Sequence, residues 1–256
     1  MLILKIIVSF LFFPKCKYKD IKTAVLAISK WLNEKSKGEK NSRDKDKQKK
    51  WIHQLEDIVK KIEVVENNII PDIERDLGYR FNDHNFLVTA FFMSNTKNVY
   101  MEILEEYHGY NHSGIDRITM KYLEKLPEIA KTLAWIGDTV IKSALLDDID
   151  ICNMADINTD ILTVKRQKYE QNTNLANLSD KWKLLENSVT LKKITTQDTK
   201  KIAHLKGSLV ESIFGALYID LNLNPKKNQD YDINKKILKL IIPDEETDNY
   251  PLKIKS

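Results

Sequence analysis

Apolar residues recur every three to four positions along most of the chain, which is the spacing of one face of an α-helix. One stripe lies between residues 21 and 33 and consists of Ile21, Ala24, Val25, Ile28, Trp31 and Leu32. A second, between residues 52 and 69, consists of Leu55, Ile58, Val59, Ile62, Val65 and Ile69. Pro71 either ends this helix or opens the next one. No stretch has a convincing strand pattern, because residues 189–194 are few and polar.

From residue 72 onward the pattern predicts helices joined by short connections. We expect them over 72–77, 84–94, 98–107, 115–146, 155–168, 172–179, 195–220 and 232–240. The expected fold class is therefore all-α. A boundary near residue 65 would separate an N-terminal helical arm with a basic linker (1–65) from a main domain (66–245), followed by a polar tail (246–256).

Composition supports one substantial helical core. The 256 residues are 42% hydrophobic, and the low numbers of glycine (7) and proline (6) disfavour a turn-rich β-sandwich or barrel. The net charge of +4 is mild, so it allows a polyanionic partner without requiring one. Cys16 and Cys152 form no CxxC pair, which argues against disulfide or zinc frameworks and favours a reducing cytoplasm.

Residues 35–50 form a charge run with eight basic side chains and three acidic ones. A solvated linker is the favoured interpretation, and a basic tether for RNA phosphates is the alternative. Residues 1–13 are apolar apart from Lys5 and Ser9, but a helix that spans a bilayer needs about 20 residues. A membrane role is therefore disfavoured relative to a packed terminal segment.

Two carboxylates interrupt apolar helices where none is expected. Asp138 follows Gly137 in one helix, and Glu211 precedes Gly215 in another that is apolar nearly all round. Glycine inside a helix costs about 1 kcal/mol relative to alanine, so close helix–helix approach is the natural reason for both glycines. If these helices cross, the two acids can converge on a site that suits Mg²⁺ or Mn²⁺. Alternatively, each acid forms a local salt bridge, for example Asp138 with Lys142 four residues later.

Three segments, in this order, resemble the ribonuclease III catalytic domain. The first, residues 73–90, contains Leu-Gly-Tyr-Arg-Phe before a predicted helix. The second is Leu-Ala-Trp-Ile-Gly-Asp-Thr-Val at 133–140, and the third covers 205–220. Residues 162–166 and 172–176 resemble the connecting segment. Each motif is moderately specific and the ordered set is strong, so the expected fold is a ribonuclease III-type helical endonuclease domain over about 72–240.

The resemblance implies a homodimer with a groove for double-stranded RNA and a carboxylate cluster that binds Mg²⁺ or Mn²⁺. Metal-activated water would cleave the RNA backbone, leaving a 5′ phosphate and a 3′ hydroxyl. Asp138 and Glu211 match the family's signature acids and are the expected catalytic and metal-binding residues. The compact form without a double-stranded RNA-binding domain is expected, since 36 residues follow Asp220.

The sequence departs from the family pattern at two of four expected carboxylates. Ala134 replaces the first glutamate of the signature helix, and Ser208 replaces the aspartate three residues before Glu211. Fewer charged ligands should weaken binding of a hard cation. The acids that could substitute are Glu124, Glu128, Asp147, Asp148, Asp180 and Glu186.

The leading hypothesis is a metal-dependent endoribonuclease that processes double-stranded or structured RNA in the cytoplasm. The alternative is a catalytically silent ribonuclease III-fold protein that binds double-stranded RNA or packs into a ribonucleoprotein. Lysines and arginines near the core are weak candidates for contacts with the RNA backbone: Lys165, Arg166, Lys200, Lys201 and Lys206. Trp135 stands at the family's signature aromatic position, where it serves either the dimer interface or core packing.

Overall fold

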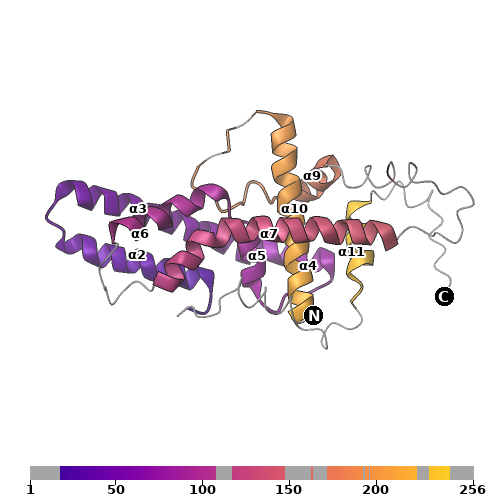
Figure 1. Cartoon of the computed structure of the whole chain (residues 1–256), viewed down its shortest axis with the longest axis horizontal. Coiled ribbons are helices and arrows are strands. Elements are labelled where there is room, and N and C mark those ends of the chain that lie inside the picture. The colour runs from indigo at the N-terminus through magenta and orange to yellow at the C-terminus, as the bar shows by residue number, and fades with distance from the viewer. Residues whose placement is uncertain are drawn as a thin grey trace, which may run out of the picture. The chain divides into compact units, whose positions relative to one another are not determined.

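The computed structural model describes residues 18–107, 117–147, 163, 172–192, 194–195, 197–223 and 231–242. Over these ranges the chain is helical without a strand, and the predicted all-α class is confirmed (Figure 1). The isolated β-bridge found there joins Phe92 to Val189 in parallel. None of the helices within these ranges is long and apolar enough to cross a membrane. The predicted helix over 155–168 lies outside the described residues apart from residue 163. Residues 1–13, Cys16 and Cys152 lie outside them as well.

Most predicted helices are present with ends shifted by a few residues. In chain order they are α2 (Ile21–Gly38), α3 (Ser42–Val64), the π-helical turn η1 (Val65–Ile69), α4 (Ile70–Leu77), α5 (His84–Ala90), the 3₁₀ turn η2 (Ser94–Thr96), α6 (Lys97–Glu106), α7 (Arg117–Asp147), α9 (Asn172–Lys181), α10 (Thr199–Leu223) and α11 (Ile233–Ile241). Pro71 is the second residue of α4 and directly follows Ile70, the residue after the π-helical turn η1.

The chain divides into two compact units, each built from segments that are far apart in the sequence. Unit 1 comprises Met1–Pro71, Asp83–Thr132 and Glu186–Thr195, and unit 2 comprises Asp72–Asn82, Leu133–Leu185 and Thr196–Ser256. The division into 1–65, 66–245 and 246–256 stays a prediction. The backbone around residue 65 is continuous helix, because α3 passes through η1 directly into α4.

In unit 1, α2 and α3 pack against each other as a helical hairpin. Asp20 caps α2 by accepting a hydrogen bond from the Thr23 amide (2.7 Å), and Asn41 caps α3 through the Arg43 amide (3.1 Å). The expectation of a linker over 35–50 is wrong, because α2 runs to residue 38 and α3 begins at residue 42. Lysine, arginine and glutamine are good helix formers, and the Asn41 cap starts the second helix within the run.

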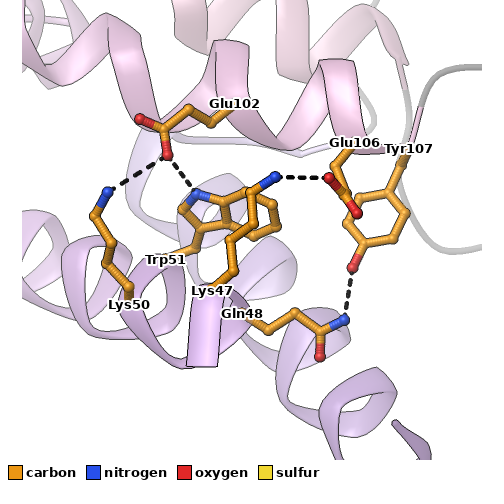
Figure 2. A network of polar contacts seen from close by, with 7 residues as sticks. All are labelled: Lys47, Gln48, Lys50, Trp51, Glu102, Glu106 and Tyr107. Carbon is orange, nitrogen blue, oxygen red and sulfur yellow. Dashed lines mark hydrogen bonds and ion pairs between the residues drawn. The ribbon is translucent and has the colours of Figure 1, made fainter. Parts of the chain in front are cut away.

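The second half of this charge run is tied down by α6. The buried indole of Trp51 donates to Glu102 (2.8 Å), which also pairs with Lys50 (3.6 Å), while Lys47 pairs with Glu106 (2.7 Å) (Figure 2). Acidic groups of α6 therefore neutralise two of the eight basic residues in the run. The run is part of the folded structure of unit 1.

Unit 2 is organised around α10, whose residues from Leu209 to Asp220 are buried apart from Glu211 and Tyr218. Helix α9 packs along it, and the ring of Trp182, just after α9, meets Phe214 edge to face at 6.3 Å. The Trp182 indole donates to Asp76 (2.9 Å). A helix that is apolar nearly all round is expected to be central to its fold, and α10 is.

A turn after α4 is fastened to the last part of α10. Gly78 adopts φ +63°, a left-handed conformation that suits glycine at a helix end. The buried carboxylate of Asp220 then accepts hydrogen bonds from the Tyr79 hydroxyl (2.7 Å), the Asn82 amide (2.9 Å) and the Asn82 side chain (2.9 Å). Three donors compensate the cost of burying this carboxylate. The Leu-Gly-Tyr-Arg-Phe segment is thereby fixed in unit 2.

Candidate functional site

Helices α7 and α10 approach each other at their glycines, within unit 2 (Figure 1). A Cβ atom added to Gly137 would lie 1.8 Å from the backbone carbonyl oxygen of Glu211. One added to Gly215 would lie 2.0 Å from the carbonyl oxygen of Leu133. Both contacts are far closer than a side chain permits, so the crossing requires glycine on both helices. This confirms the close approach predicted from the two glycines.

The crossing brings Asp138 and Glu211 into one electrostatic site. Asp138 follows Gly137 directly, and the Glu211 backbone is the surface that Gly137 touches. The charge of Asp138 acts on Glu211, and Lys142 acts on both acids. The Lys142 ammonium lies 2.6 Å from Asp138 Oδ2. The local salt bridge that the sequence offered as an alternative is therefore present alongside the convergence of the two acids.

Burial raises the pKa of Glu211 to about 7, helped by the negative charge of Asp138 and opposed by the ammonium of Lys142. The carboxyl of Glu211 is therefore partly protonated at neutral pH. A group with this pKa can exchange a proton under physiological conditions. An approaching cation would favour the charged form of Glu211, so the carboxyl would release its proton readily when a cation binds.

Positions 134 and 208 border this site without adding charge. Ala134 lies one helical turn before Asp138 and Ser208 lies three residues before Glu211, and both are half-buried. Among the expected substitutes, Asp180 pairs with Lys206 (2.6 Å), Glu124 with Lys97 (3.7 Å) and Glu128 with Lys131 (3.1 Å). Glu186 is exposed in unit 1, whereas Asp148 and the side chain of Asp147 lie outside what the structure describes.

Asp138 and Glu211 fit a divalent cation as a pair of oxygen donors. Their mutual repulsion contributes to the raised pKa of Glu211, and a cation placed between them would relieve it. Hard cations prefer carboxylate oxygens, but they also prefer more than two. Within the described ranges, no group of three or more acidic, histidine or cysteine side chains is close enough to hold a metal ion.

The remaining candidates have different environments. Trp135 is 72% exposed, so the core-packing interpretation of this residue is wrong. Lys200 and Lys201 are exposed, with Lys201 near Asp198 (3.6 Å). Lys206 is largely covered and paired with Asp180, which leaves it less available to RNA. Lys165 and Arg166 lie outside the described residues.

The structure adds one residue that sequence reasoning did not assign to a role. Asp220 closes the third motif, yet its carboxylate is fully buried against Tyr79 and Asn82. The one sign in the sequence that Asp220 has a structural role is that an acid stands at the end of an apolar helix. Its partners lie 138 and 141 positions away, which no local pattern reveals.

The fold and this site define an all-α protein with a carboxylate pair at a glycine-mediated helix crossing. Residues 131–222 match the family model of the ribonuclease III domain, which confirms the resemblance drawn from the sequence. The match covers 92 of the 256 residues and contains Asp138, Glu211 and both crossing glycines. No curated protein and no solved structure matches the chain.

Proposed function

We propose that this chain is a ribonuclease III-type endoribonuclease that hydrolyses the backbone of double-stranded or structured RNA. The proposal rests on one observation: Asp138 and Glu211 share a site at the α7–α10 crossing, inside the matched segment. The family's substrate class and chemistry then apply to that site. The cytoplasm remains the predicted compartment.

Each residue of the site has a distinct task in this proposal. Asp138 and Glu211 would hold Mg²⁺ or Mn²⁺, which supplies charge neutralisation at the phosphate and a more acidic water when bound. The glycine crossing fixes the separation of the two acids, because neither backbone can shift without opening the contact. Lys200 and Lys201 are exposed and are proposed to contact RNA phosphates, reading shape rather than sequence.

We also propose that the chain forms a homodimer through the exposed face of α7. Trp135 presents a large apolar ring to solvent, and Leu146, eleven residues later on α7, is 60% exposed. Eleven residues are close to three helical turns, so both side chains lie on one side of the helix. Large apolar side chains exposed on one helix face favour association with another protein surface.

A silent RNA-binding protein is the second candidate, and specific observations favour it. Ala134 and Ser208 remove a charged ligand from each helix, and Lys142 already pairs with Asp138. A site with this charge balance holds a metal ion less strongly than four carboxylates would. RNA binding itself does not require the missing acids.

Cleavage of a double-stranded RNA by the full-length protein separates the two candidates. The wild type, Asp138→Asn and Glu211→Gln are incubated with the RNA and Mg²⁺ or Mn²⁺, and binding is followed in parallel. Cleavage by the wild type alone, with binding by all three, supports the endonuclease. Binding without cleavage by any of them supports the silent binder, and equal cleavage by all three contradicts the assignment of Asp138 and Glu211.

A further inference from the structure

Lys142 places a positive charge directly on the candidate metal site. It lies one helical turn after Asp138 on α7, and its ammonium is 2.6 Å from Asp138 Oδ2. Both side chains are half-buried, with 44% of Lys142 and 38% of Asp138 exposed. An ion pair this exposed contributes little to stability, so holding α7 together is a weak explanation for Lys142.

The same ammonium also acts on the second acid. It lowers the pKa of Glu211, whereas burial and Asp138 raise it. Lys142 therefore pairs directly with Asp138, and its charge also reaches Glu211. Two carboxylates and one ammonium leave this site with one net negative charge when Glu211 is ionised.

We propose that Lys142 is the built-in counter-ion of the Asp138–Glu211 pair and competes with a divalent cation for these carboxylates. The inference rests on the proposed function only in that the two acids form the cation site. It adds a residue outside the carboxylate pattern that sets how tightly the site holds a metal. The absence of acids at positions 134 and 208, together with the presence of Lys142, then produces a site of low metal affinity.

The size of the effect follows from electrostatics. Two unit positive charges about 4 Å apart repel measurably even in bulk water, and a divalent ion doubles that repulsion. Salt screening and movement of the flexible lysine reduce it. Removing the charge of Lys142 should therefore tighten Mn²⁺ binding by about tenfold.

The test is direct Mn²⁺ binding to the full-length protein, measured by the electron paramagnetic resonance signal of the free ion. Lys142→Met removes the charge and keeps the length of the side chain, and we expect it to bind about tenfold more tightly than the wild type. Lys142→Arg keeps the charge and should bind like the wild type. Asp138→Asn/Glu211→Gln should abolish the difference between lysine and methionine at position 142.

Lys206→Met is the matched control, because Lys206 also lies 2.6 Å from a carboxylate, that of Asp180, in the same unit. Its Mn²⁺ affinity should equal that of the wild type. Thermal unfolding shows whether each variant is folded, and Lys142→Gln replaces Lys142→Met if the latter is not. Equal affinity of the wild type and the neutral variant overturns the proposal, as does tightening by Lys206→Met of the same size.

The binding readout keeps this inference distinguishable from the endonuclease assignment. Tighter Mn²⁺ binding by Lys142→Met without RNA cleavage by any variant supports the counter-ion and contradicts the enzyme. Cleavage by the wild type with unchanged Mn²⁺ affinity in Lys142→Met supports the enzyme and contradicts the counter-ion. Absence of Mn²⁺ binding by the neutral variant at millimolar concentration contradicts the counter-ion as well.

Discussion

The backbone of Gly137 lies against the carbonyl of Glu211 so closely that even one added methyl group would overlap it, at 1.8 Å. This contact joins the two helices that carry the candidate acids. It places Asp138, the next residue on α7, beside the turn of α10 that carries Glu211. The position of both acids thus depends on a residue that has no side chain.

Gly137→Ala should therefore destabilise unit 2 by about 3 kcal/mol or more, because α7 and α10 must move apart to admit the methyl group. Chemical unfolding followed by circular dichroism measures the change. Gly38→Ala is the matched control, since a Cβ there meets nothing within 4 Å, and its effect should stay within about 1 kcal/mol. A loss of stability no larger than that of the control would contradict the close crossing.

The raised pKa of Glu211 predicts a pH-dependent stability. The folded protein holds this proton up to about pH 7, whereas an unfolded glutamate releases it near pH 4.5. The stabilising contribution is thus complete below the unfolded pKa and is lost as the pH rises through the folded pKa. Relative to Glu211→Gln, the wild type should lose about 1–2 kcal/mol between pH 5 and pH 8, discounted for partial exposure. Urea unfolding at four pH values measures this, and parallel curves for the two proteins would refute it.

Removal of the buried acid at the end of α10 should cost more than removal of one of its partners. Asp220→Ala leaves the Tyr79 hydroxyl and two Asn82 N–H groups without their acceptor, so we expect a loss of about 2–4 kcal/mol. Tyr79→Phe removes a single hydrogen bond and should cost about 1 kcal/mol. Comparable losses for the two variants in chemical unfolding would argue against a shared acceptor.

Association should depend on the exposed tryptophan. Trp135→Ser is expected to shift the protein from dimer to monomer in sedimentation velocity, with little change in unfolding, because the ring is 72% exposed in the single chain. Ile118→Ser, at a residue of α7 that is 54% exposed, serves as the control and should leave the dimer intact. A monomeric wild type, or equal effects of the two substitutions, would contradict the proposed interface.

Restoring the missing acids should strengthen the cation site. Ala134→Glu combined with Ser208→Asp adds a charged oxygen donor to each helix, so Mn²⁺ binding should tighten by roughly tenfold or more. Thr139→Glu adds one negative charge at an exposed position of α7, next to Asp138, and should have a much smaller effect. If the double variant binds no better than Thr139→Glu, the two positions do not border the site.

Patterns local in the sequence predicted the helices and the crossing well. The 3.6-residue period identified α2, α3 and α10, and the interior glycines Gly137 and Gly215 indicated the contact that the structure contains. The spacing of four residues between Asp138 and Lys142 also indicated their salt bridge, which is present. Each of these features is decided within a few turns of one helix.

Features decided by distant partners were not predictable in the same way. The high charge of residues 35–50 favours a solvated linker, yet α6 supplies Glu102 and Glu106, which pair with Lys50 and Lys47. The exposure of Trp135 could not be inferred, since core and interface residues share the same apolar pattern. The partners of Asp220 lie outside the third motif altogether.

The buried Asp220 also bears on how the chain is completed during synthesis. Tyr79 and Asn82 leave the ribosome well before Asp220, their acceptor 138 to 141 residues later, has been made. Unit 2 can close this contact only after α10 has emerged, so its assembly is governed by long-range contacts that form slowly. A nascent chain stalled just before residue 220 should therefore expose the 72–82 segment to proteases, while a chain stalled beyond α10 can protect it.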